Sequence, residues 1–193
     1  MASNEHREAN MRTFIGADFN RDIKDNIAGI QHIVRENSER GRFKYVGNFH
    51  LTLKFLGEIQ QEKTADIGKS LKAIASKHHK IHLNIDKIGY FDGKESIHAL
   101  WLGFSGELDK LKALYSDVEE EMHKLGIKKE IKAYTPHITI AQDLLLRIPF
   151  EKLKEKVDFK SFRTIEVKEI SLIKSEEVQG KRIYTPISAF GLK

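Results

Sequence analysis

The chain has 193 residues, of which 40% are hydrophobic and 32% are charged, so it is long enough to bury the core of one ordinary folded domain. It contains no cysteine, which excludes disulfides, thiolate nucleophiles and cysteine-based metal sites. The net charge of +5 weakly favours anionic partners. No apolar run approaches the roughly 20 residues that cross a bilayer, so we expect no membrane partner and a cytoplasmic location.

The first half of the chain alternates strand and helix patterns. The polar segment 1–10 lacks the apolar stretch of a secretory signal, and we expect it to be a flexible leader before a single domain over 11–193. Residues 12–19 are typical of a strand, and 20–40 of a helix with Asn20 as its N-cap. Apolar periodicity then predicts a strand over 50–56, a helix over 61–79 and a strand over 81–91.

The second half continues the alternation. Asp92-Gly93 indicates a hairpin turn into a strand over 97–104. A helix is predicted over 106–125, a strand over 137–141, and a helix over 142–157 that is interrupted near Pro149. Two strands, 164–174 and 182–192, close the chain around the turn SEEVQGK.

The pattern His-x-Thr occurs twice within these strands, as His50-Leu-Thr52 and as His137-Ile-Thr139, and the two copies lie 87 residues apart. Gly16 and Gly103 repeat at the same offset, so each copy reads strand, helix, His-x-Thr strand, helix, strand. This internal repeat predicts a bilobal, pseudo-twofold α+β fold. We expect two mostly antiparallel sheets, helices on their outer faces, and the two His-x-Thr strands facing one another across a central cleft.

The residue types in this pattern suit a phosphate ester. Alternate side chains of a strand share a face, so each histidine lies beside its threonine while the residues between them turn inward. Threonine hydroxyls can donate to phosphoryl oxygens, and two imidazoles with pKa values near 6.5 can hold one proton between them. One histidine would then accept a proton while the other donates one. The neighbouring sequence lacks further metal ligands, so we expect neither a metal nor a cofactor.

The flanks of both motifs resemble those of the two-histidine phosphoesterases. RTFIGADF, HLTLKFLGEI, HALWLGF, YTPHITIAQ and the closing segment ISLIKSEEVQGKRIYTPISAF are most similar to the RNA 2′,3′-cyclic phosphodiesterases, historically called 2′-5′ RNA ligases. The resemblance implies hydrolysis of a 2′,3′-cyclic phosphate end of RNA or an oligonucleotide to a 2′-phosphate. It also implies that His50 protonates the leaving 3′ oxygen, that His137 activates water, and that Thr52 and Thr139 hold the phosphate.

The chain departs from this family at Gln142, where members often carry an arginine. Lys54 lies on the same predicted strand face as His50, which makes it the candidate substitute cation. Tyr134, just before the second motif, is the candidate to stack on a base. Two basic segments, around Arg42 and Lys128, either follow a phosphate backbone or form solvated loops.

Two other functions remain open on the sequence. Gln142 allows a non-catalytic module that binds RNA or a nucleotide in the same cleft. The same acid–base pair could also join RNA ends through a 2′-5′ linkage, since it serves both directions of the reaction. We expect the protein to act as a monomer.

Overall fold

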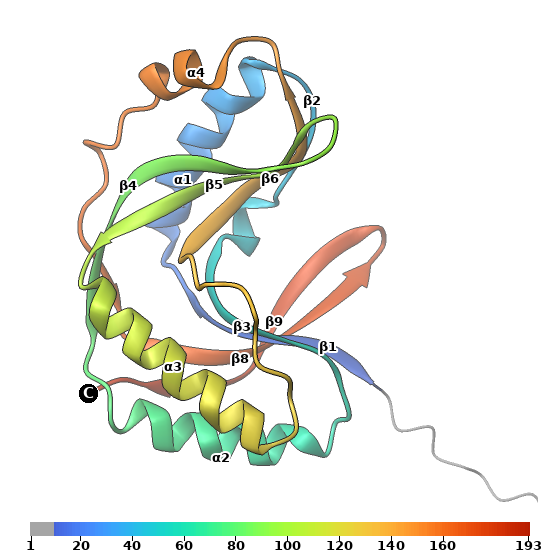
Figure 1. The fold of residues 1–193 in the computed structure, drawn as a ribbon, viewed down its shortest axis with the longest axis vertical. Helices are drawn as coiled ribbons and strands as arrows, with labels where there is room; N and C mark the ends of the chain where they lie inside the picture. Colours follow the sequence, from blue (N-terminus) through green and yellow to red (C-terminus); the bar gives the residue numbers. More distant parts are fainter. Residues whose placement is uncertain (1–9) are drawn as a thin grey trace, which may run out of the picture.

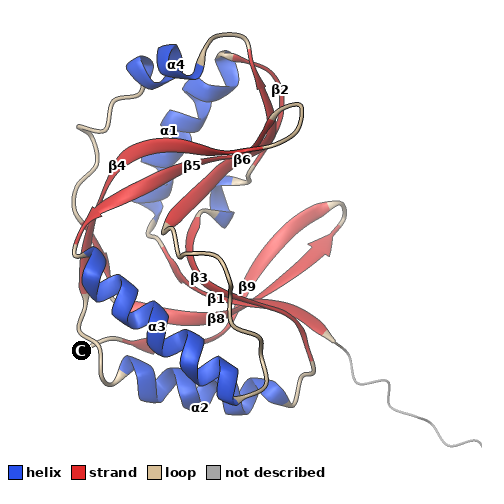
Figure 2. Ribbon diagram, in the orientation of Figure 1, coloured by secondary structure: helices blue, strands red, loops and turns tan. Residues whose placement is uncertain are grey.

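The computed structural model describes residues 10–193, so the predicted leader lies outside the described residues except for Asn10. Two antiparallel sheets lie one above the other in the view of Figure 1, each accompanied by helices (Figures 1 and 2). The four-stranded sheet has the order β3 (His50–Ile59), β1 (Met11–Asp18), β8 (Glu169–Val178), β9 (Lys181–Gly191). The five-stranded sheet has the order β2 (Ser38–Phe43), β6 (His137–Leu146), β5 (Ile97–Gly106), β4 (Ile81–Asp92), β7 (Ile165–Val167). The predicted α+β class with two antiparallel sheets is confirmed.

The helices cover these sheets in a crossed arrangement. They are α1 (Arg21–Glu36), α2 (Lys63–Ala75), α3 (Leu108–Lys124) and the short α4 (Phe150–Lys156), with a 3₁₀ turn η1 (Val46–Asn48). In the first repeat, α1 packs on β2 and β6 of the five-stranded sheet, whereas α3 of the second repeat packs on β3. The first helix of each repeat therefore packs on the sheet that contains the motif strand of the other repeat. Because of this exchange, both repeats contribute to one hydrophobic core.

Helix α1 shows how the sequence sets a local boundary. The side chain of Asn20 accepts a hydrogen bond from the backbone N–H of Ile23 at 3.0 Å, which confirms the predicted N-cap. Ile27, Ile30 and Val34 are buried, because their spacing places them on one face of the helix. Within the described residues, no helix is both long and apolar enough to cross a membrane.

Three predicted elements are wrong in extent. The helix predicted over 20–40 ends at Glu36, and the polar segment 38–43 forms strand β2, an edge strand that carries the charges typical of an edge. The helix predicted over 142–157 is shorter than expected, since β6 runs on to Leu146 and only 150–156 is helical. The single strand predicted over 164–174 is divided between the two sheets as β7 and β8.

Both motif strands carry a β-bulge directly after the threonine. The register shifts so that the residue after it, Leu53 in β3 and Ile140 in β6, has no direct partner, and these two residues also lie 87 apart. The next residues, Lys54 and Ala141, are buried, so the alternation of faces reverses beyond the bulge. The repeat is thus kept in the bulges as well as in the motifs.

The glycine repeat is not kept in register. Gly16 of β1 lies opposite Thr52, whereas Gly103 of β5 lies opposite His137. A Cβ at position 16 would lie 2.6 Å from the backbone oxygen of Leu51, which leaves no room for a side chain beside the first motif. Gly16 is therefore required by the close approach of β1 to β3.

Replacing Gly16 by alanine is expected to lower the free energy of unfolding by about 1–3 kcal/mol, because the new methyl group forces β1 and β3 apart. Chemical denaturation measures this change. The matched control is Gly29→Ala in α1, where nothing lies within 4 Å of the added Cβ. That variant is expected to gain up to about 1 kcal/mol from helix propensity, and equal effects of both substitutions would contradict the packing argument.

Candidate active site

The four motif side chains line one cavity of about 250 Å³. His50 and Thr52 come from β3 of the four-stranded sheet, and His137 and Thr139 come from β6 of the five-stranded sheet. The structure therefore brings together two pairs that are far apart in the sequence, on strands of different sheets. Two imidazoles and two hydroxyls around a space of this size can surround a single phosphoryl group.

Each imidazole is fixed by the backbone two residues before it. Nδ1 of His50 lies 2.7 Å from the carbonyl oxygen of Asn48, and Nδ1 of His137 lies 2.7 Å from that of Thr135. Because a carbonyl only accepts, Nδ1 carries the proton in both rings, and in the neutral ring Nε2 is the acceptor. Nε2 of His50 accepts from the hydroxyl of Thr52 at 2.8 Å. Among the described residues, Nε2 of His137 has no hydrogen-bond partner.

Aromatic edges complete the orientation of both rings. Tyr184 of β9 meets His50 at 90° with ring centroids 5.0 Å apart, and Phe91 of β4 meets His137 at 86° and 5.2 Å. Phe14 lies 4.6 Å from the His50 ring, also between centroids. These contacts limit rotation of the imidazoles, so each Nε2 keeps its direction relative to the cavity.

The surroundings change the proton affinity of both histidines. Burial lowers the pKa of His50 to about 4, and the Lys44 and Lys24 charges add to this effect while the Asn48 carbonyl and Asp18 oppose it. Burial also lowers the pKa of His137. Burial therefore favours the neutral form of both rings in the free protein, and a proton shared by the pair needs the added negative charge of a bound anion.

Lys54 does not line this cavity, and its predicted role as the substitute cation is corrected. The bulge at Leu53 turns its side chain away from the face of His50 and into the protein. Its Nζ donates to Glu119 at 2.6 Å and to the carbonyl oxygen of Lys128 at 2.9 Å, and its side chain is only 3% exposed. Lys54 thus joins β3 to α3 and to the loop before the second motif.

Tyr134 packs through one face of its ring and lines a neighbouring cavity together with Thr52 and His137. Its ring stacks on Tyr115 with centroids 4.0 Å apart and an interplanar angle of 4°. Its hydroxyl donates to the carbonyl oxygen of Thr52 at 3.0 Å. Tyr134 therefore connects the loop before the second motif to the strand of the first.

Gln142 does reach the cavity, because it lies beyond the bulge of β6 and so returns to the face of Thr139. Its Oε1 accepts a hydrogen bond from Nζ of Lys44 at 2.6 Å. Lys44 lines the same cavity and comes from the basic segment before the first motif. The position where family members often carry an arginine therefore still adjoins a cation.

Other cavity residues were not predicted from the sequence. Phe55 takes the face predicted for Lys54 because of the bulge, and its side chain is among the most exposed large hydrophobic groups, at 64%. Phe91, His98 and Tyr184 come from strands that carry no motif. Only the period-two alternation of those strands could have indicated a shared face, and that signal does not say which face meets the motifs.

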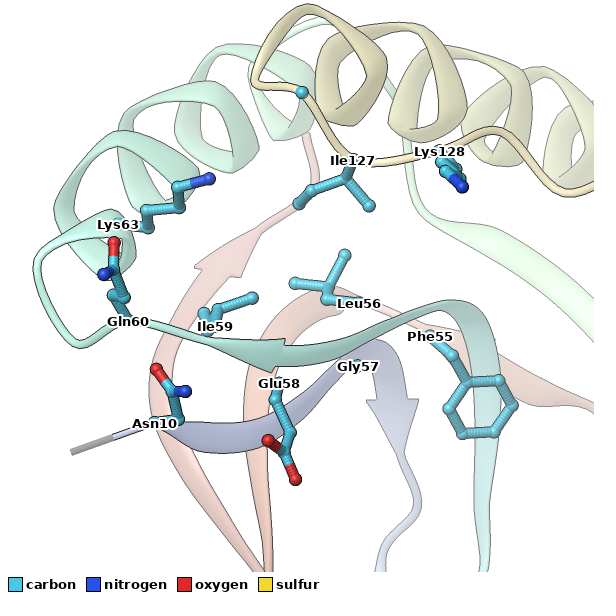
Figure 3. Close-up of a pocket in the computed structure, with 11 residues that line it drawn as sticks. Asn10, Phe55, Leu56, Gly57, Glu58, Ile59, Gln60, Lys63, Ile127 and Lys128 are labelled. Atoms are coloured by element: carbon cyan, nitrogen blue, oxygen red, sulfur yellow. The ribbon is translucent and has the colours of Figure 1, made fainter. Parts of the chain in front are cut away.

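A larger cavity, of about 580 Å³, lies between the end of β3 and the segment after α3 (Figure 3). In that view Leu56, Ile59 and Ile127 point toward one another between the strand and the segment. Neither histidine of the motifs lines it. Volume therefore does not single out the functional site, whereas the convergence of acid–base and hydrogen-bonding groups does.

Comparisons with known proteins agree with this geometry. Residues 24–179 match the model of the 2′-5′ RNA ligase superfamily. A protein of Methanocaldococcus jannaschii named RNA 2′,3′-cyclic phosphodiesterase is 32% identical over 186 residues, which cover 92% of this chain and 98% of that protein. A Thermotoga maritima protein of the same name is 32% identical over 149 residues, covering 77% and 79%. The fold matches E. coli LigT complexed with 3′-AMP with a TM-score of 0.79 and 24% identity, over 96% of this chain and 99% of LigT.

Titration of the assigned histidine ring protons by NMR is expected to give a midpoint of about 4 for His50 and a midpoint below 6.5 for His137. Burial disfavours the charged imidazolium, which causes both decreases. Saturating inorganic phosphate should raise both midpoints, because an anion in the cavity stabilises the charged rings. A His50 midpoint at or above 6.5 in the free protein would contradict this description of the site.

Proposed function

Because the chain belongs to the 2′-5′ RNA ligase superfamily, we propose that it hydrolyses 2′,3′-cyclic phosphate ends of RNA to 2′-phosphates. The observation that supports this most strongly is the convergence of His50, Thr52, His137 and Thr139 on one cavity. The two relatives named RNA 2′,3′-cyclic phosphodiesterase, each 32% identical, support the same reaction. The substrate is an RNA or oligonucleotide end.

The reaction is an in-line displacement at phosphorus. Nε2 of His137 accepts a proton from water as the water oxygen attacks the phosphorus atom. The P–O3′ bond breaks, and the protonated Nε2 of His50 gives its proton to the departing 3′ oxygen. One water molecule is added in total, and the phosphate remains on the 2′ oxygen. Each proton transfer of this kind typically contributes about 10²- to 10⁴-fold in rate.

The backbone contacts at Nδ1 suit these roles. With Nδ1–H donating to a carbonyl oxygen, each ring presents Nε2 as its reactive atom. His137 is suited to act as a base directly, because burial lowers its pKa and so favours the neutral imidazole. His50 must gain a proton first, and the negative charge of the bound phosphodiester supplies the electrostatic stabilisation that its buried site otherwise lacks.

The threonines complete the phosphate site. In the free protein the hydroxyl of Thr52 donates to His50, so it exchanges this acceptor for a phosphoryl oxygen when His50 becomes protonated. Thr139 occupies the matching position beside His137 on β6 and donates to the same phosphoryl group. Neutral donors of this type bind the non-bridging oxygens without competing for the transferred protons.

A monomeric state, a cytoplasmic location and independence from metals belong to the same proposal. Both histidines and both threonines come from one chain, so a single protomer carries the whole motif set. In the part of the chain that the structure describes, no cluster of three or more histidine or carboxylate side chains is arranged to hold a metal ion. Because the two proton transfers use the imidazoles, EDTA is expected to leave the rate unchanged.

Single replacements of His50 and of His137 by alanine are each expected to lower kcat on an RNA ending in a 2′,3′-cyclic phosphate by about 10²- to 10⁴-fold. The loss follows because each variant lacks one of the two proton transfers. Phosphorus NMR of the wild-type product should show a 2′-phosphomonoester. Steady-state rates with and without EDTA test the independence from metals in the same assay.

The control variant is His32→Ala, since His32 is an exposed side chain of α1 outside the cavity. It should retain wild-type turnover, and circular dichroism should show all three variants folded. Full activity in both of the first two variants would overturn the acid–base proposal. Binding of the RNA end without any turnover would favour the non-catalytic module, and release of a 3′-phosphate would contradict the proposed bond cleavage.

A further inference from the structure

Lys44 is held at the edge of the phosphate cavity by its own backbone. It follows β2 and precedes η1, and its N–H donates to the carbonyl oxygen of Ile140 at 3.0 Å. Its carbonyl oxygen accepts from Nε2 of Gln31 at 2.8 Å, and the same amide nitrogen also donates to Ile140 at 2.8 Å. The backbone of Lys44 is therefore fixed to the bulge of β6, next to Thr139, independently of its side chain.

The ammonium group of Lys44 has an amide for a partner but no carboxylate. Its Nζ donates to Gln142 at 2.6 Å, and among the described residues no Asp or Glu lies within ion-pairing distance of it. The two other lysines near the first motif differ in this respect. Lys24 pairs with Asp18 at 2.6 Å, and Lys54 pairs with Glu119 at the same distance. Neither of those two lines the cavity.

The charges around Lys44 leave it electrostatically uncompensated. Arg42 is paired with Asp143, and Arg182 lies 3.5 Å from Glu177, so each has its own carboxylate. Burial and these two guanidinium groups lower the pKa of Lys44, an effect that Asp143 only partly opposes. A half-buried cation without a counter-ion gains most from an anion that enters the adjoining space.

We propose that Lys44 is the cation that binds the phosphoryl oxygens of the ligand in this cavity, with Gln142 holding its ammonium group in place. The ligand class is a phosphate ester anion, and for the substrate this assignment rests on the proposed function. Lys44 is the only lysine or arginine among the described residues that line the cavity with both histidines. Lys44, hydrogen-bonded to Gln142, therefore supplies the positive charge that an arginine at position 142 would carry.

The direct test is the affinity for inorganic phosphate, which needs no turnover. Lys44→Met removes the charge and keeps an unbranched apolar stem, and the backbone contacts of residue 44 do not depend on the side chain. We expect the Kd for phosphate, measured by NMR titration, to rise about 10- to 100-fold, the range of a lost charge-assisted hydrogen bond. Lys112→Met on α3, an exposed lysine outside the cavity with the same charge change, should leave the Kd unchanged.

A rescue variant separates charge from packing. In the double variant Lys44→Met with Gln142→Arg, a guanidinium on the residue that held the ammonium replaces the lost charge. We expect most of the phosphate affinity to return. If Lys44→Met proves unstable, the wild-type protein still gives the answer, since the 13Cε resonance of Lys44 should shift when phosphate is added, and an unchanged resonance would overturn the assignment.

A second readout comes from His50, whose pKa the charge of Lys44 helps to lower. Its NMR midpoint should rise in Lys44→Met and fall back in the rescue variant. Unchanged phosphate affinity in Lys44→Met would overturn the assignment. If Lys44→Met loses phosphate affinity while the wild-type protein turns over no cyclic phosphate, Lys44 remains an anion-binding residue and the proposed function fails, so the two failures can be told apart.

Discussion

The site depends on one repeated interaction, the hydrogen bond from Nδ1–H of each motif histidine to the carbonyl oxygen two residues earlier. This bond fixes the tautomer, because only the protonated nitrogen can donate to a carbonyl. It also fixes the direction of the ring, so that Nε2 is the nitrogen presented for proton transfer. The antiparallel strands, the bulges and the aromatic contacts of His50 and His137 all serve to hold these two rings around one cavity.

The pseudo-twofold arrangement is most exact at the motifs and is broken just beyond them. The bulges at Leu53 and Ile140 keep the 87-residue offset, and they return Phe55 and Gln142 to equivalent places at the cavity. The ring of Phe55 thus occupies the place in the first repeat that the amide of Gln142, with Lys44 bound to it, occupies in the second. This difference makes a nearly symmetric acid–base pair asymmetric in charge, which allows an asymmetric ligand to bind in one orientation.

The sequence predicted what depends on short-range pattern. The two motifs, their 87-residue repeat and the N-cap at Asn20 follow from local periodicity and side-chain chemistry, and the structure bears out the α+β fold that they indicate. The sequence could not predict the bulges, because a residue without a partner on the neighbouring strand leaves no local sequence signal. Period-two alternation without the bulge therefore places Lys54 on the wrong face of β3.

The bulge in β6 breaks the alternation that would indicate its continuation to Leu146. The polar edge strand β2 has no apolar alternation that would indicate a strand. The low pKa of His50 depends on burial contributed by distant strands. A residue's own sequence neighbours do not reveal this burial.

In the proposed reaction both imidazoles contact one phosphoryl group from opposite sides. A crystal structure of the protein with a 2′,3′-cyclic uridine vanadate complex, which mimics five-coordinate phosphorus, tests this most directly. We expect Nε2 of His50 and Nε2 of His137 each to lie within about 2.6–3.2 Å of a different apical oxygen. A complex in which only one ring reaches the vanadate, or in which both rings bind the same oxygen, would contradict it.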